Sequence, residues 1–123
     1  MPKTHVTDAE LAILKLLWSH EQMTVRQLTD NLYPAGSNSD IATVQKLIQR
    51  LEKKKLVRRD RSTHAHLFVA LISKNEFAGE QLAAMADKLS DGSMAPLLIH
   101  LVEKKKISKK EQAEIRQILN RHK

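Results

Sequence analysis

At 123 residues and a net charge of +7, the chain has the length of one domain or two very small ones, and 41% hydrophobic residues allow a packed core. The absence of cysteine excludes disulfides, thiolate metal sites and cysteine nucleophiles, and 3% aromatic residues give little surface for stacking on single-stranded bases. No stretch has the pattern of a signal sequence or a membrane span, so we expect a soluble cytoplasmic protein.

Two short helices are predicted at the start of the chain. Residues 7–10 read Thr-Asp-Ala-Glu, a capping box in which the first side chain accepts from the fourth N–H and the fourth reaches back. The apolar stripe that follows ends near Ser19 and contains Trp18, which we expect in the core. Residues 24–27 begin a second helix in the same way, and the turn-rich residues 33–38 end it.

The stretch from Ser39 to Ile72 has the pattern of a recognition helix followed by a strand pair. Asp40 is a suitable N-cap. One face repeats apolar residues with the helical period, at Val44, Leu47, Ile48 and Leu51. The other faces carry side chains that donate to base edges or phosphates: Thr43, Gln45, Lys46, Gln49, Arg50 and Lys53. Strands are predicted from residue 56 and at 67–71, joined by the polar turn 61–64. This arrangement is typical of a winged-helix DNA-binding domain.

Most of the excess positive charge lies in this stretch. Residues 46–61 contain eight Lys or Arg against two acidic residues, a net +6, compared with +7 for the whole chain. A run such as residues 53–55 is most often a solvated helix face. Here the run joins a helix to a hairpin and its neighbours are uncharged donors, so contact with nucleic acid is the preferred interpretation.

Three amphipathic helices are predicted in residues 73–123, with hardly enough apolar mass for a separate core. Capping boxes at 73–76 and 108–111 begin the first and third, and Pro96 suits the first turn of the second. Such stripes usually pair with a second copy, so we expect a homodimer. The expected dimerisation residues are Phe77, Leu82, Met85, Leu89, Leu97, Leu98, Leu101, Val102, Ile115, Ile118 and Leu119. The predicted fold is mainly α, with a winged helix-turn-helix domain at 1–72 and a helical dimerisation domain at 73–123.

Two kinds of DNA contact are expected. Residues in the first two turns of a recognition helix point into the major groove, which assigns base edges to Thr43, Gln45 and Lys46. The alternative for each is contact with phosphate or water only. Phosphate contacts, which position a domain without reading sequence, are expected from Thr24, Val25, Arg26, Arg50, Lys53, Arg59, Arg61 and His64.

Other chemistries are weakly indicated. His64 and His66 face one side of a strand, but no third metal ligand is evident, so phosphate contact or simple exposure is preferred. His100 lies among apolar residues and is expected to pack at an interface. No catalytic spacing or phosphate loop is evident, so we predict no enzymatic activity, cofactor or metal. The alternative function is a protein-interaction module whose basic face meets an acidic partner; a membrane-surface protein fits less well.

With these residues in view, the chain resembles the penicillinase-repressor (BlaI/MecI/CopY) family of bacterial winged-helix repressors. The resemblance rests on residues 7–10 with Trp18, on the run T-V-Q-K-L-I-Q-R-L at 43–51, and on positions between 102 and 119. It implies a homodimer that binds a palindromic operator on double-stranded DNA and blocks transcription. The copper branch of the family relies on C-terminal cysteines, so the absence of cysteine excludes thiolate copper sensing.

The resemblance also implies a mode of release. In the best-known branch, a membrane sensor-protease responds to β-lactam, and the repressor is cut at an Asn-Phe bond in its C-terminal lobe. The matching pair here is His100-Leu101, the candidate cleavage site. Two further departures are Asp40-Ile41, where members often have Ser-Pro, and Lys55, where many have Gly. We therefore predict release by a protease of altered specificity or regulation without cleavage.

Overall fold

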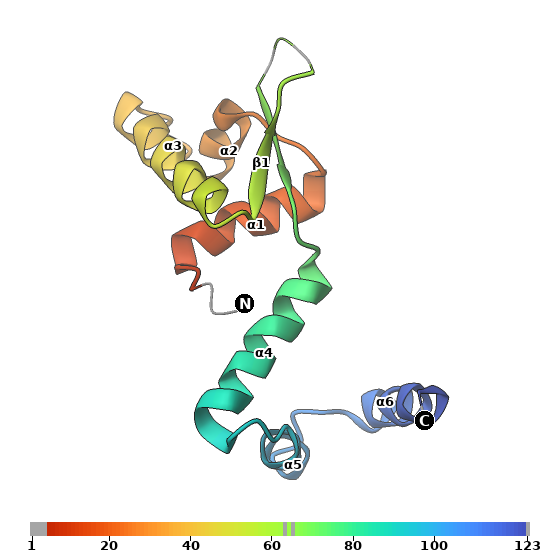
Figure 1. Ribbon diagram of the computed structural model, residues 1–123. Coiled ribbons are helices and arrows are strands. Elements are labelled where there is room, and N and C mark those ends of the chain that lie inside the picture. The colour runs from red at the N-terminus through yellow and green to blue at the C-terminus, as the bar shows by residue number, and fades with distance from the viewer. Residues whose placement is uncertain (1–4, 63, 65, 123) are drawn as a thin grey trace. The chain divides into compact units, whose positions relative to one another are not determined.

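The computed structural model describes residues 5–62, 64 and 66–122, and in them the chain forms helices and one antiparallel hairpin (Figure 1). The elements in chain order are α1 (Asp8–His20), α2 (Val25–Leu32), α3 (Asn38–Lys53), β1 (Val57–Asp60), β2 (Leu67–Ala70), α4 (Lys74–Ser90), α5 (Ala95–Glu103) and α6 (Lys109–Arg121). The predicted mainly α fold, with a hairpin after the third helix, is confirmed. The chain divides into two compact units, Met1–Glu80 and Gln81–Lys123.

The predicted capping boxes are present, and a further one begins α3. Ser37 is the N-cap of that helix, and its Oγ accepts from the Asp40 N–H at 3.1 Å while Asp40 Oδ2 accepts from the Ser37 N–H at 3.2 Å. The prediction that Asp40 is the N-cap is therefore wrong. Asp40 occupies the third helical position, where an acidic residue completes a capping box, so the helix begins earlier than expected.

The core of the first unit is formed by the inward stripes of α1 and α3, one residue of α2 and the base of the hairpin. Its buried members are Ile13, Leu14, Leu17, Met23, Leu28, Val44, Leu47, Ile48, Leu51, Leu56, Val57, Phe68 and Phe77. Trp18 packs against this cluster from its edge, and its indole N–H donates to the carbonyl of Ile72 at 2.8 Å. The Trp18 ring also lies 5.7 Å from the ring of Phe77, centroid to centroid. The start of α4 is thereby attached to the first unit.

The hairpin is held in one register by its base. Arg59 pairs with Phe68 across the two strands, and Phe68 also bridges to Met23 through N–H···O bonds of 2.8 and 3.2 Å. The turn out of α3 places Lys55 in the left-handed region at φ 63°, and the Leu56 N–H donates to the carbonyl of Leu51 at 3.0 Å. In Figure 1 the hairpin projects beyond α2 and α3.

The second unit exposes its apolar side chains. Neither α5 nor α6 contains a buried residue, and Ala86 is the one buried hydrophobic residue among those described after Glu80. A hollow of about 240 Å³ between α5 and α6 is lined mostly by apolar residues: Leu98, Val102, Ile107, Gln112, Ile115, Arg116 and Leu119. In the described part of the chain, no helix has the length and apolar character needed to cross a membrane.

Candidate nucleic-acid interface

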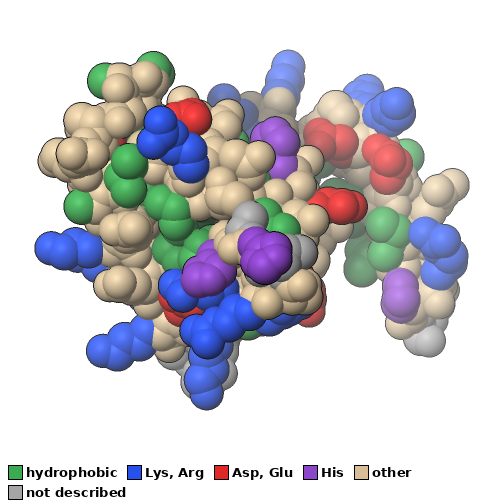
Figure 2. Space-filling model, turned by 90° about the horizontal axis from the view of Figure 1, so that it is seen from above, with side chains coloured by type: hydrophobic (Ala, Val, Ile, Leu, Met, Phe, Trp, Pro, Cys, Tyr) green, Lys and Arg blue, Asp and Glu red, His purple; other side chains and the backbone are tan. Residues whose placement is uncertain are grey.

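The outer face of α3 is polar, basic and exposed. Its inward stripe packs in the core, and this orientation leaves the long polar side chains in solvent: Thr43, Gln45, Lys46, Gln49, Arg50 and Lys53. The Thr43 hydroxyl donates to the carbonyl of Ser39 at 3.0 Å, so its proton is already used within the helix. Four of these side chains line a shallow groove of about 300 Å³, namely Lys46, Gln49, Arg50 and Lys53. Figure 2 shows Lys, Arg and His side chains gathered around the hairpin on the face seen from above.

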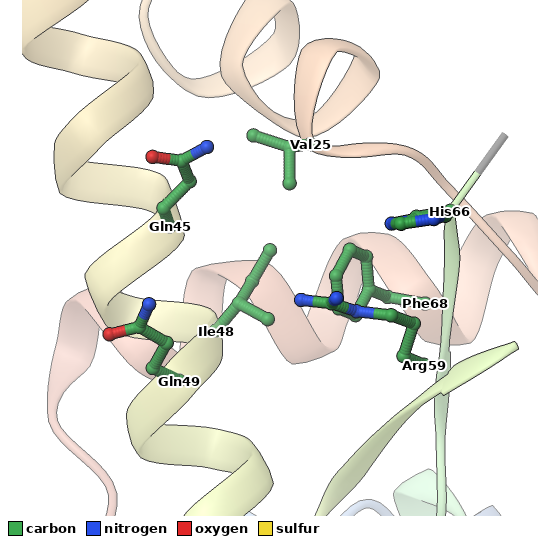
Figure 3. A pocket seen from close by; sticks show the side chains of 7 residues that line it. All are labelled: Val25, Gln45, Ile48, Gln49, Arg59, His66 and Phe68. Atoms are coloured by element: carbon green, nitrogen blue, oxygen red, sulfur yellow. The ribbon is translucent and has the colours of Figure 1, made fainter. Parts of the chain in front are cut away.

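A second hollow lies between α3, the start of α2 and the hairpin (Figure 3). It measures about 340 Å³, and it is lined by Val25, Gln45, Ile48, Gln49, Arg59, His66 and Phe68. We call it the wing pocket. The Arg59 guanidinium carbon lies 5.2 Å from the centroid of the Phe68 ring, a cation–π arrangement. In Figure 3 the guanidinium extends from β1 toward Ile48 and α3. The wing pocket thus lies between α3 and the hairpin and is lined by residues of both.

The turn at the end of β1 is ordered by a carboxylate. Asp60 Oδ1 accepts from the Ser62 N–H at 2.9 Å, and hydrogen bonding by Ser62, helped by the charge of Arg58, lowers the pKa of Asp60. Arg61 and His64 are exposed beside it, where a phosphate can reach them. Position 63 of the predicted turn lies outside the described residues. Among the described residues, no three His, Cys, Asp or Glu side chains are grouped to hold a metal ion.

One lysine of the basic stretch is used inside the fold. Lys54 Nζ lies 2.7 Å from Glu10 Oε1 and 2.6 Å from the carbonyl oxygen of His5. Burial raises the pKa of Glu10, but the hydrogen bond from Lys54, the Thr7 N–H and the Lys54 charge outweigh it, and the net pKa is lowered. Glu10 is fully buried, and this bond ties α1 to the end of α3. Lys54 therefore adds less to the outer charge than the count for residues 46–61 indicates.

The predicted phosphate contacts at the start of α2 are differently placed. Val25 lines the wing pocket. The Thr24 hydroxyl accepts from the Gln27 N–H at 3.1 Å, so it serves as a cap. Arg26 is exposed, and its Nε atom lies 3.8 Å from Oδ1 of Asp30, one turn further along the helix. An exposed pair at that distance is weak, so the Arg26 guanidinium stays available to an anion.

Two residues of this face, Gln49 and Phe68, were not among the assigned contacts, and for His66 the sequence left phosphate contact and simple exposure open. Gln49 borders both the groove on α3 and the wing pocket, whereas the sequence identified it only as a donor on the polar face. His66 and Phe68 line the wing pocket. Gln49 follows from the helical periodicity of α3, whereas the signal that finds Phe68 is the hairpin register, which places Arg59 opposite Phe68. That register depends on the pairing of two strands and is not visible in the helical periodicity of the sequence.

The predicted dimerisation residues are mostly exposed, at fractions from 37% for Leu98 to 66% for Leu89. Leu97 is partly buried. Phe77 differs from the others, because it is 8% exposed and packs in the core of the first unit. His100 and Leu101, the candidate cleavage pair, are both exposed on α5.

The first unit has three helices followed by a hairpin wing, and the third helix has an exposed basic face. This arrangement defines a winged helix-turn-helix protein. The family model described as penicillinase repressor matches residues 6–121, and the chain belongs to that family.

Three similar proteins carry names of the same family. Transcriptional regulator BlaI of Mycobacterium tuberculosis (strain CDC 1551 / Oshkosh) is 36% identical over 105 residues, covering 82% of this chain and 74% of the relative. The penicillinase repressor of Staphylococcus aureus is 23% identical over 118 residues, or 96% and 93% of the two chains. The methicillin resistance regulatory protein MecI of Mammaliicoccus sciuri is 22% identical over 116 residues, or 94% of each chain.

Proposed function

We propose that this protein is a sequence-specific DNA-binding transcriptional repressor that acts as a homodimer on a dyad-symmetric operator. The observation that carries the proposal is the outer face of α3, which is exposed, basic and rich in amide donors at the edge of a complete winged-helix core. The family membership supports the same function. A recognition helix of this kind enters the major groove while the wing lies on the backbone.

The proposal divides the contacts into two classes. Thr43, Gln45 and Lys46 are proposed to reach base edges, because they are exposed in the middle turns of α3, on its outer side. Phosphate contacts are proposed for residues that are exposed, that line the groove on α3 or the wing pocket, or that lie at the start of α2. They are Thr24, Val25, Arg26, Arg50, Lys53, Arg59, Arg61 and His64. The first class sets sequence preference, and the second sets position and salt dependence.

The second unit is proposed to complete its core with another copy of the chain. Its exposed apolar residues are Leu82, Met85, Leu89, Leu98, Leu101, Val102, Ile115, Ile118 and Leu119. A two-fold interface lets the same surface cover itself and presents two α3 helices to two half-sites. Phe77 is left out of this interface because the first unit already buries it.

Selection from a pool of random duplexes tests the function. The full-length protein is expected to enrich an inverted repeat. Lys46→Ala is expected to lower affinity for that repeat by about 1–3 kcal/mol per half-site and relax one base position. Arg61→Ala is expected to weaken selected and random duplexes alike and to flatten the salt slope by roughly one unit per half-site.

Two results would contradict the proposal. Enrichment of no sequence over random duplex would leave the alternative, a module whose basic face binds an acidic protein. Equal loss on selected and random duplex for Lys46→Ala would make Lys46 a phosphate contact.

Release from the operator is proposed to differ from cleavage at Asn-Phe. The candidate pair His100-Leu101 lies inside helix α5, so a protease needs local opening of that helix as well as pockets for imidazole and isobutyl groups. We propose a sensor-protease of altered specificity or regulation without cleavage. Immunoblots of β-lactam-treated cells test this. A fragment ending at His100 would show cleavage at this bond, and an intact chain during induction would indicate another signal.

A further inference from the structure

We infer that the wing pocket is a binding site for one deoxyribose-phosphate unit of the duplex backbone. We also infer that Phe68 is the residue that positions Arg59 in this pocket. The inference rests on the proposed DNA-binding function. It adds Gln49 and His66 to the proposed contacts, and it assigns Arg59, already proposed as a phosphate contact, to one particular phosphate together with the other residues of the wing pocket.

The polar lining of the wing pocket is made entirely of groups that can donate hydrogen bonds. Gln49 contributes an amide from α3, Arg59 its guanidinium from β1, and His66 an imidazole from the hairpin. Gln45, which is proposed to reach a base edge, borders the pocket. None of the seven lining residues is acidic. A pocket with several donors and no carboxylate favours an anion over a cation or a neutral base edge.

Arg59 is incompletely satisfied within the protein. Its Nε atom is buried and has no hydrogen-bond partner. A buried donor without a partner calls for an explanation, because most such groups are paired in folded proteins. In Figure 3 the guanidinium reaches across the pocket, beside the Phe68 ring and toward α3. A phosphate oxygen in the pocket would supply acceptors to this planar, multi-donor group.

Part of the wing-pocket lining is apolar, which favours a sugar-phosphate over a bare anion. Val25 at the start of α2 supplies most of the exposed apolar surface, since Ile48 and Phe68 are each 2% exposed, and the hollow of about 340 Å³ has room for more than a phosphate group. A deoxyribose would present carbon atoms to Val25 while its phosphate meets the donors. Val25 is also the first residue of α2, so the pocket opens at the positive end of that helix.

Phe68 is placed to fix the direction of Arg59. It is 2% exposed, and both its backbone N–H and its carbonyl are bonded to Met23. Its ring therefore cannot move without disturbing the core, and Arg59 stacks on it from the opposite strand. A stacked guanidinium has lost much of its rotational freedom before the phosphate arrives, so less is lost on binding. Phe68 acts on the phosphate only through Arg59.

The neighbouring residue of β1 provides a matched control. Arg58 carries the same charge, is exposed and pairs with Val69. Adjacent residues of a strand point to opposite faces, so Arg58 points away from the wing pocket. Removing Arg58 changes the net charge as much as removing Arg59 does, but leaves the pocket intact.

The test is a phosphate-by-phosphate scan with the full-length protein. A duplex enriched from the random pool is prepared with each phosphate of one half-site replaced in turn by a neutral methylphosphonate. With the unchanged protein, at least one position in the half-site is expected to weaken binding about 10- to 100-fold. With Arg59→Ala, that position is expected to lose its sensitivity while the others keep theirs. With Arg58→Ala, the whole pattern is expected to remain.

Two further variants separate charge from positioning. Arg59→Lys keeps the charge and the salt slope but is expected to lose most of the sensitivity at that one phosphate, because Lys lacks the planar fork. Phe68→Leu is expected to reduce the same sensitivity while Arg59 is still present, in a protein whose circular dichroism is unchanged. Should Phe68→Leu fail to fold, Phe68→Met replaces it, because it also keeps a large apolar side chain and removes the ring. Full retention of the sensitivity by a folded Phe68→Met would refute the positioning role, and its loss with Arg59 present would support it.

The contradicting results are distinct from failure of the proposed function. If no duplex is enriched, the proposed function fails before the scan begins. If a duplex is enriched but Arg59→Ala keeps the full pattern of phosphate sensitivity, or Arg58→Ala erases it, the wing pocket is not the phosphate-binding site. The proposed DNA-binding function is then unaffected. A flat scan, together with a shift of the His66 NMR signals on adding inorganic phosphate in place of chloride at equal ionic strength, would make the pocket a free-anion site and overturn the inference.

Discussion

The two units of this chain treat their apolar residues in opposite ways. Among the described residues, every buried hydrophobic side chain except Ala86 lies in the unit that ends at Glu80. Of the exposed large hydrophobic side chains that the structure describes, all except Leu71 lie in the unit that begins at Gln81. Both units are built from capped amphipathic helices of similar length.

The difference shows that amphipathic helices alone do not make a core. In the first unit α1, α2 and α3 cross one another, and the hairpin closes the remaining side through Phe68. In the second unit α5 and α6 leave a hollow between them and bury no residue. Exposed apolar surface of this extent marks an interaction site, which is why a second copy of the chain is the proposed partner.

Leu101→Asp is expected to have the largest effect, because a homodimer would have to bury an unpaired carboxylate at a cost of several kcal/mol. The protein should sediment as a monomer at micromolar concentration and bind its duplex far more weakly. Gln117→Asp adds a carboxylate at an exposed polar position of α6, outside the proposed interface residues, and should remain dimeric. A Leu101→Asp protein that sediments as a dimer would remove this residue from the interface.

The boundary between the units is expected to be visible in fragments. A fragment of residues 1–80 keeps Phe77 against Trp18, and a fragment of residues 1–72 loses it. The longer fragment should be more stable by about 1.5–3 kcal/mol, the worth of one buried Phe side chain, in urea unfolding. Equal stability would place the boundary at residue 72, as the sequence predicts.

The Glu10–Lys54 bond is expected to contribute to the first unit alone. Lys54→Met leaves the buried carboxylate of Glu10 with the Thr7 N–H as its remaining partner, and should cost about 1–3 kcal/mol at pH 7. Because the folded pKa of Glu10 is lowered, its contribution is full above the unfolded pKa of about 4.3 and is lost as pH falls through the folded value.

Glu10→Gln provides the control, since it keeps a capping-box side chain and removes the titration. Its stability should fall less between pH 5 and pH 3 than that of the unchanged protein, by thermal unfolding. An identical pH dependence in the two proteins would show that Glu10 does not titrate differently on folding.

The smallest expected effect concerns the start of α3. Ser37→Ala should lower stability by about 1 kcal/mol, the usual cost of removing an N-cap, whereas Ser39→Ala should change it by a few tenths. Urea unfolding measures both. Because α3 is also the proposed recognition helix, Ser37→Ala should reduce duplex binding slightly as well. The reverse order of the two variants would return the N-cap to the neighbourhood of Asp40.

Much of the fold was predictable because its signals are local. The boxes at Thr7, Thr24, Ser73 and Ser108 each join groups three residues apart, and the apolar stripes repeat within single helices. Asp40 was misplaced for a local reason too, because Ser37 and Asp40 both suit an N-cap and only the geometry selects one. The residues of the α3 face followed from the same periodicity.

The candidate site was predictable only in part. The wing pocket combines residues of α2, α3 and the hairpin, and its Arg59–Phe68 pair depends on strand register. Lys54 belongs to a basic run in the sequence, yet its ammonium group bonds to Glu10, 44 residues away. A charge count cannot separate cations that face solvent from one that is used inside.

The amino-acid sequence was sufficient to place the helix ends to within a few residues, to identify the apolar face of each helix, and to predict a donor-rich outer surface on α3. Tertiary structure decided what covers those apolar faces. It placed Phe77 in the first core beside Trp18, left Leu98 and Leu101 exposed, and set Arg59 on Phe68. The physical reason is that periodicity records that a surface must leave water, whereas its partner is chosen by contacts between residues far apart in the chain.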